Sequence, residues 1–90
     1  MDPTKAANVI VYSTPTCPYC VMAKSYLKSR GVRYEDVDVS LDRGRAMEMI
    51  RASGQQGVPV IVIGGRVIVG FDRPGIDHAL TLPPIGKTAP

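Results

Sequence analysis

The 90-residue sequence predicts a single α/β domain with a mixed four-stranded sheet flanked by three helices on its two faces. Two observations predict this fold class. Strand-like and helix-like segments alternate through the first half of the chain, as in a β-α-β unit with parallel strands. Two further strand-like segments then flank the pair Gly64-Gly65, which favours a hairpin and therefore an antiparallel pair. No repeat and no linker marks a second domain.

The first half of the chain contains two strand-like segments and the helix between them. Residues 8–12 form a continuous apolar run, which is typical of a buried central strand. Residues 18–30 are predicted as a helix, because Pro18 suits a first helical turn and Gly31 suits a helix end. Residues 32–39 alternate between apolar and polar, as expected for a strand with one face in solvent.

A second helix should follow, with Ser40 or Asp42 as its N-cap. Its apolar residues recur at helical spacing, and we expect the methionines among them to fill the core. These residues are Ala46, Met47, Met49 and Ile50. Strands are predicted at residues 60–63 and 66–69, on either side of the hairpin turn.

The end of the chain is predicted to hold one short helix. Residues 70–75 interrupt the strand pattern, and residues 76–80 are expected to form the helix. Residues 81–90 are rich in proline and are expected to be a frayed tail, whereas residues 1–7 look like a loose lead. The domain core should therefore cover residues 8–80.

Composition and charge exclude several classes of function. The formal net charge is +3, acidic and basic residues are interspersed, and aromatic residues make up only 6%, so a nucleic-acid surface has little support. No apolar run approaches the roughly 20 residues of a membrane span, and none follows Met1 as in a signal peptide. We therefore expect a cytoplasmic monomer with no membrane contact.

The two cysteines of the chain, Cys17 and Cys20, lie three residues apart at the junction of the first strand and helix. Only a thiolate attacks a disulfide, and an ordinary thiol with a pKa of about 8.5 is mostly protonated at neutral pH. A sulfur at a helix N-terminus faces unpaired N–H groups and the positive end of the helix dipole. We expect this position to favour the thiolate of Cys17, which is then the catalytic nucleophile.

The helical repeat separates the two cysteines by role. Cys20 shares an apolar stripe with Ala23 and Leu27, so we expect it to face the core and to act as the resolving catalytic thiol. Cys17 lies on a neighbouring stripe that includes Lys24 and should face solvent or a partner. Lys24 is about two turns beyond Cys17, too far for a direct contact to be expected.

Two other uses of the cysteines carry less weight. A structural disulfide that closes so short a loop would restrict the unfolded chain little. A zinc site needs about four ligands, and besides the cysteines only His78 is an obvious ligand, so we expect no metal site.

Over residues 8–80 the chain resembles a glutaredoxin of the thioredoxin-like superfamily. Three features in the same order carry the resemblance: Cys17-Pro18-Tyr19-Cys20 after the first strand, Val58-Pro59 before the hairpin, and Gly70-Phe71-Asp72 after it. The resemblance implies a thioredoxin-like fold and a dithiol oxidoreductase that exchanges thiols with disulfides. It implies no permanently bound cofactor, glutathione as co-substrate, and disulfide-containing proteins as partners.

The resemblance also assigns residues to the site. Pro18, Tyr19 and Pro59 would support the active site, and the Val58-Pro59 bond would be cis. The backbone of Val58 would then hydrogen-bond an extended cysteinyl peptide or glutathione as if a strand were added. The resemblance places the following residues at the glutathione or substrate site: Thr14, Tyr19, Gln55, Val58, Pro59, Gly70, Phe71 and Asp72.

Several departures from the family pattern weaken the expected glutathione site. Thr14 stands where glutaredoxins usually have Lys or Arg, and Arg73 stands where a second acid is usual. Asp72 remains available for the ammonium of a γ-glutamyl group, and Gln55 for a carboxylate. The Gly70-Phe71 pair is similar to the corresponding residues of redoxins that are reduced by thioredoxin reductase.

Two alternative functions therefore stay open beside a glutaredoxin that uses glutathione and glutathione reductase. One is a redoxin that takes electrons from thioredoxin reductase and serves ribonucleotide reductase. The other is a module that binds or carries an iron–sulfur cluster between two chains through Cys17 and bound glutathione, which Pro18 disfavours by resemblance.

Overall fold

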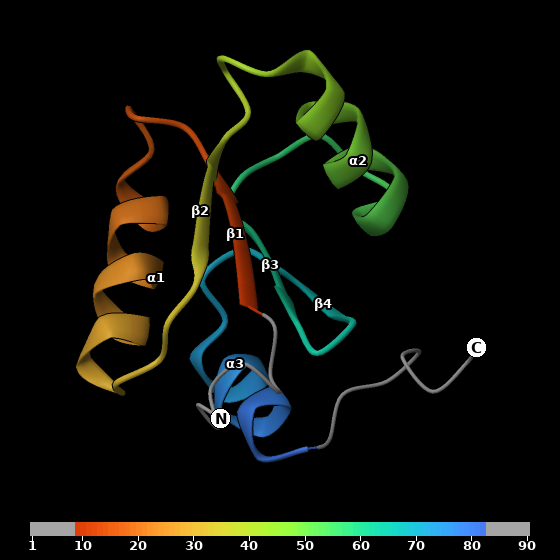
Figure 1. Ribbon diagram of the computed structural model, residues 1–90. Coiled ribbons are helices and arrows are strands. Elements are labelled where there is room, and N and C mark those ends of the chain that lie inside the picture. Colours follow the sequence, from red (N-terminus) through yellow and green to blue (C-terminus); the bar gives the residue numbers. More distant parts are fainter. Residues whose placement is uncertain (1–8, 83–90) are drawn as a thin grey trace.

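The computed structural model describes residues 9–82 and folds them into the predicted mixed sheet with three helices (Figure 1). Residues 1–8 and 83–90, which include the first residue of the first predicted strand and most of the predicted tail, lie outside the described residues. The elements in chain order are β1 (Val9–Ser13), α1 (Pro18–Ser29), β2 (Glu35–Asp38), α2 (Arg43–Ser53), β3 (Val60–Ile63), β4 (Arg66–Val69) and α3 (Arg73–Thr81).

The sheet has the strand order β2-β1-β3-β4, so β1 lies in its interior. β1 runs parallel to β2 and antiparallel to β3, and β4 returns antiparallel to β3. Gly64 and Gly65 have φ angles of 58° and 90°, which glycine adopts freely, and these two residues form the hairpin turn. The arrangement confirms the predicted thioredoxin-like fold.

Alternation along β1 gives the domain one apolar cluster on each face of the sheet. On one face, Val9 and Val11 pack with residues of both α1 and α3: Ala23, Leu27, Ile76 and Ala79. On the other face, Tyr12 packs with Val37, Val60 and Met49 of α2. Figure 1 shows α1 and α2 on opposite sides of the sheet.

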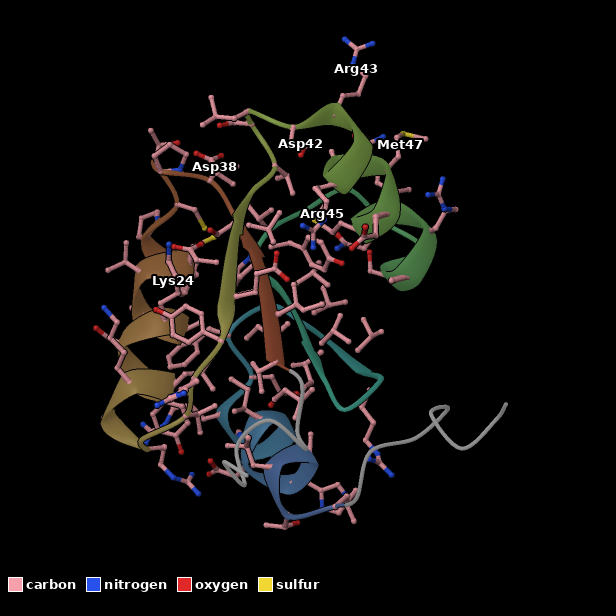
Figure 2. The ribbon with its side chains drawn as sticks, viewed as in Figure 1. Lys24, Asp38, Asp42, Arg43, Arg45 and Met47 are labelled. Atoms are coloured by element: carbon pink, nitrogen blue, oxygen red, sulfur yellow. The ribbon has the colours of Figure 1, made fainter. Side chains whose placement is uncertain are left out.

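Arg45 links α2 to the sheet, whereas Arg43 and Met47 of the same helix face outward. Its guanidinium lies 3.0 Å from Glu35 of β2 and 3.2 Å from Glu48, and it stacks 6.0 Å from the centre of the Tyr12 ring. Met47 is 46% exposed and points away from the sheet, as Arg43 does (Figure 2).

The sequence predicted that Met47 and Met49 of α2 both fill the core. This is confirmed for Met49, which is buried, and wrong for Met47.

β2 is shorter than the alternating pattern of residues 32–39 predicted. The N–H of Val32 donates to the carbonyl of Leu27 at 3.0 Å, and Gly31, with a φ of 73°, donates to Lys28. These two bonds are the Schellman motif that ends a helix. Because Val32 completes the end of α1, the strand begins only at Glu35.

α3 begins three residues earlier than predicted. Asp72 is its N-cap and accepts a hydrogen bond from the N–H of Gly75 at 3.2 Å, while Pro74 lies in the first turn. A Cβ atom on Gly75 would lie 2.6 Å from an oxygen of Asp72, so glycine leaves room for this cap. The interpretation of residues 70–75 as an interruption missed this start, and Thr81 belongs to the helix rather than to the tail.

The N-cap of α2 gives a stability prediction. Asp42 accepts a hydrogen bond from the N–H of Arg45 at 3.1 Å, as the sequence predicted for one of two candidate caps. Asp42→Ala should lower the free energy of unfolding by about 0.5–2 kcal/mol, because one N–H of the first turn loses its partner. Urea denaturation followed by circular dichroism measures this loss.

Asp42→Asn is the matched control, because asparagine caps a helix about as well as aspartate. It should retain most of the stability. An equal loss in both variants would mean that the charge, and not the cap, accounts for the effect.

Candidate active site

The turn between β1 and α1 sets the position of both cysteines. β1 ends at Ser13, and the N–H of Cys17 donates to the carbonyl of Thr14 at 3.4 Å, which closes the turn. Cys17 is the N-cap of α1 with an extended backbone (φ −97°, ψ 110°), and Pro18 occupies the first helical turn. The strand–turn–helix junction predicted from the sequence is confirmed.

The sulfur of Cys17 takes the place of the oxygen atom that usually caps a helix. The N–H of Cys20 donates to Cys17 Sγ at 3.2 Å, and the Cys17 thiol faces the carbonyl oxygen of Val58 at 3.9 Å. Cys17 is partly exposed, and the neighbouring Tyr19 side chain is 62% exposed. The Cys17 sulfur is therefore open to a substrate and receives an N–H that stabilises negative charge on it.

Cys20 lies behind Cys17 and is fully buried, at 0% exposure. Burial, and then the hydrogen bond with Cys17, raise the pKa of the Cys20 thiol to about 11. A backbone hydrogen bond from Thr14 and the charge of Lys24 act in the opposite direction. Both cysteines are free thiols, so this is the reduced state, in which Cys20 stays protonated at neutral pH.

Segments distant in sequence meet at the two cysteines. The Val58-Pro59 bond is cis, as the resemblance implied, and the carbonyl of Val58 faces Cys17. Pro59 is buried, and its carbonyl accepts a hydrogen bond from the N–H of Gly70 at 2.8 Å. This bond connects the end of β4 to the start of β3, so the Gly70 end of the hairpin lies beside Val58 and Pro59.

Three side chains expected to bind glutathione make other contacts. The amide of Gln55 exchanges two hydrogen bonds with the backbone of Gly57, at 2.8 and 3.0 Å. Asp72 caps α3. The ring of Phe71 packs edge-on against Tyr26, with centroids 6.0 Å apart. In this structure, all three side chains are therefore engaged in contacts within the protein.

Arg73, which stands where a second acid was expected, also has a defined contact. Its guanidinium lies over the ring of Tyr26, 4.9 Å from the centroid, at the start of α3. Between α1 and this end of α3 an open groove of about 520 Å³ is lined by Met22, Ser25, Tyr26, Ser29, Phe71 and Arg73.

A polar cluster beside Cys20 was missed by the sequence reasoning. The ammonium of Lys24, which projects from α1 on the side of β2 (Figure 2), lies 3.0 Å from Asp36 and 3.4 Å from the hydroxyl of Ser13. The Ser13 hydroxyl in turn donates to Asp36 at 3.1 Å. The presence of charged Asp36 in a predicted strand, opposite a lysine-bearing helix, was the available signal.

Comparison with known proteins decides the family. The glutaredoxin family model matches residues 9–68, which include both cysteines and the Val58-Pro59 pair. This chain belongs to the glutaredoxin family.

Two curated relatives and one solved structure illustrate the similarity. An uncharacterized glutaredoxin-like 8.6 kDa protein in a rubredoxin operon of Clostridium pasteurianum is 51% identical over 70 residues, covering 78% of this chain and 93% of the relative. Glutaredoxin 3 of Escherichia coli K12 is 41% identical over 81 residues, covering 82% and 98%. A buckwheat glutaredoxin–glutathione complex superposes with a TM-score of 0.69 at 25% identity, covering 87% of this chain and 76% of that one.

Membership in the glutaredoxin family makes this chain a thiol–disulfide oxidoreductase with a thioredoxin-like fold. Within residues 9–82, no helix of this glutaredoxin is long and apolar enough to cross a membrane. In the same part of the chain, no three His, Cys, Asp or Glu side chains gather as a metal site would require.

The buried Cys20 thiol makes the stability of this glutaredoxin depend on pH. Because the folded protein favours protonated Cys20, its contribution is fully present below the ordinary thiol pKa of about 8.5 and is lost as the pH rises through about 11. We expect this loss to be on the order of 1–3 kcal/mol of the free energy of unfolding of the reduced protein.

Cys20→Ala is the reference, since other groups also titrate in this range. Urea denaturation at a series of pH values should show that the difference in stability between wild type and Cys20→Ala shrinks above the ordinary thiol pKa. A difference that stays constant with pH would contradict the role of burial.

Proposed function

We propose that this glutaredoxin reduces protein disulfides and glutathione mixed disulfides by a dithiol cycle on Cys17 and Cys20. The contact between the Cys20 N–H and Cys17 Sγ, at 3.2 Å, is the observation that carries the proposal. It combines an accessible sulfur that receives a hydrogen bond with a second, buried sulfur that is itself hydrogen-bonded to the first. A nucleophile and a resolving thiol need this combination.

In the first step, the thiolate of Cys17 attacks one sulfur of the substrate disulfide. The other substrate sulfur leaves with the electron pair and takes up a proton, and a mixed disulfide remains on Cys17. The carbonyl of Val58, which faces Cys17 at 3.9 Å, can accept a hydrogen bond from the backbone of the bound substrate segment. The segment would then pair with residue 58 as an added strand.

In the second step, Cys20 attacks Cys17 Sγ and displaces the remaining substrate sulfur as a thiolate. The Cys17–Cys20 disulfide forms, and the substrate has gained two electrons. Either glutathione or a flavoprotein reductase then returns the disulfide to the dithiol.

The exchange needs no permanently bound cofactor, and we propose glutathione as a co-substrate only. The glutathione complex of the buckwheat relative supports this part of the proposal. A dithiol that must be reduced in each cycle suits the cytoplasm, where we place this glutaredoxin as a monomer. An iron–sulfur cluster would instead give the purified protein a brown colour, whereas the dithiol form is colourless.

Substitution of the two cysteines should affect the two classes of substrate differently. Cys17→Ser should abolish activity on all disulfides. Cys20→Ser should abolish reduction of protein disulfides but retain that of glutathione mixed disulfides, because external glutathione can replace Cys20 in the second step. Assays of both variants on insulin and on a glutathionylated peptide measure this.

The matched control for the Cys20 substitution is Ser25→Ala, a change on an exposed position of the same helix, which should leave both activities unchanged. Equal loss of both activities in Cys20→Ser would refute the division of roles.

A second candidate function differs in the source of electrons. Gln55 and Asp72, two side chains expected to hold glutathione, are engaged within their own loop and helix cap. Thr14 and Arg73 also replace the usual cation and anion. These observations favour a redoxin that is reduced by thioredoxin reductase and passes electrons to an enzyme such as ribonucleotide reductase.

Restoring the two charges tests the choice of reductant. Thr14→Lys with Arg73→Asp should raise kcat/KM for glutathione mixed disulfides roughly two- to thirtyfold, since each partly exposed contact contributes about 0.2–1 kcal/mol. Aspartate at the first position of α3 also suits the helix dipole. The gain should lie chiefly in KM and shrink at high salt.

The oxidised wild type should then be offered two reductants in separate assays, glutathione plus glutathione reductase in one and thioredoxin reductase in the other, and the two rates of reduction compared. No gain in the double variant at low ionic strength would show that the missing charges do not limit the use of glutathione.

A further inference from the structure

The second step of the proposed cycle requires a thiolate on a buried sulfur. Burial favours protonated Cys20, so a nearby group that favours the thiolate would speed the attack on Cys17. The candidate groups come from the elements around Cys20: Cys17 and Lys24 on α1, the backbone of Thr14 after β1, and Asp36 on β2.

Two further described residues near this cluster, Val58 and Tyr34, present neutral groups. The carbonyl of Val58, at the cis bond to Pro59, faces the Cys17 thiol. Tyr34, which precedes β2 near Lys24 and Asp36, is held neutral because burial raises its pKa. Cys17 is bonded to the substrate during the second step and carries no charge then. Among the groups named here, Lys24 is therefore the cation that acts on Cys20.

Lys24 is one helical turn beyond Cys20 and is held in place. Its ammonium contacts Asp36 at 3.0 Å and Ser13 at 3.4 Å, and the Ser13 hydroxyl closes the triangle to Asp36 at 3.1 Å. Ser13 is 2% exposed, and the Lys24 side chain is 22% exposed against 49% for Asp36. A cation that is fixed and partly shielded from water acts on a neighbouring charge more strongly than one in free solution.

We propose that Lys24 stabilises the thiolate of Cys20 during the attack on the mixed disulfide, and that Ser13 and Asp36 position its ammonium. The proposal rests on the dithiol cycle above. The Cys20 thiol releases its proton to water, the thiolate forms the bond to Cys17 Sγ, and the bond from Cys17 to the substrate sulfur breaks. The electron pair of that bond leaves with the substrate thiolate, which is then protonated.

A purely structural role for the same ion pair makes a different prediction. If Lys24 and Asp36 only fasten α1 to β2, removal of either partner breaks the same contact and has the same effect. If Lys24 acts by its charge, Asp36 partly cancels that charge, and the two removals change the second step in opposite directions. Asn at position 36 still offers an oxygen to Ser13 and Lys24, so it removes the charge and keeps the contacts.

Stopped-flow reaction with dithiobis-nitrobenzoate, an aromatic disulfide whose released thiolate is coloured, separates the two steps. Attack by Cys17 releases the first thiolate at a rate that depends on reagent concentration. Attack by Cys20 releases the second at a rate that does not. Cys20→Ser identifies the second phase, because it should release one thiolate only.

We expect Lys24→Met to slow the second phase about three- to tenfold at neutral pH. The midpoint of its rate–pH profile should move to higher pH. Lys24→Arg should restore most of the rate. Asp36→Asn should accelerate the second phase and move the midpoint of its rate–pH profile to lower pH. Lys28→Met, a loss of the same charge one turn further along α1, is the matched control and should leave the second phase unchanged.

Equal slowing by Lys24→Met and Asp36→Asn, or an unchanged pH profile in both, would overturn the proposal. If Lys24→Met does not fold, Asp36→Asn decides alone, since slowing in that variant contradicts a charge effect. Failure of the dithiol cycle itself is distinguishable, because the wild type would then show no second phase that is independent of reagent concentration.

Discussion

A single hydrogen bond, from the N–H of Cys20 to the sulfur of Cys17, connects the fold to its chemistry. The first turn of a helix has N–H groups without partners, and an oxygen side chain usually satisfies one of them. Here a sulfur does so. The contact therefore fixes where α1 begins and how Cys17 is oriented. The same N–H also stabilises negative charge on Cys17, so cap and reactive group are one side chain.

The sheet holds this junction in place from both sides. β1 is an interior strand, and its last residue, Ser13, is buried and bonded to α1 and β2. β3 begins directly after Pro59, whose carbonyl is tied to Gly70 at the end of β4. The carbonyl of Val58, next to this connection, faces Cys17 at 3.9 Å from a segment far along the chain.

The sequence predicted those features that depend on local periodicity. The separation of an exposed Cys17 from a buried Cys20 follows from the helical repeat, and the structure confirms it. The position of Lys24 depends on how α1 is rotated against β2 and on the register that brings Asp36 near Ser13, and neither is encoded locally. Asp72 shows a different limit, because one aspartate can bind a ligand or cap a helix, and residue type alone does not distinguish these uses.

The position of β4 at the sheet edge has a consequence for self-association. Val67 and Val69 are 38% and 50% exposed on this strand, which is the last strand of the sheet among residues 9–82. A sheet edge with apolar side chains is a template on which a second chain can extend the sheet. β4 has only four residues, Arg66 stands at its start, and Gly70, with a φ of 83°, turns the backbone out of the strand at its end. A second chain could therefore form only a few hydrogen bonds with this strand, and short edge strands of this kind disfavour edge-to-edge aggregation.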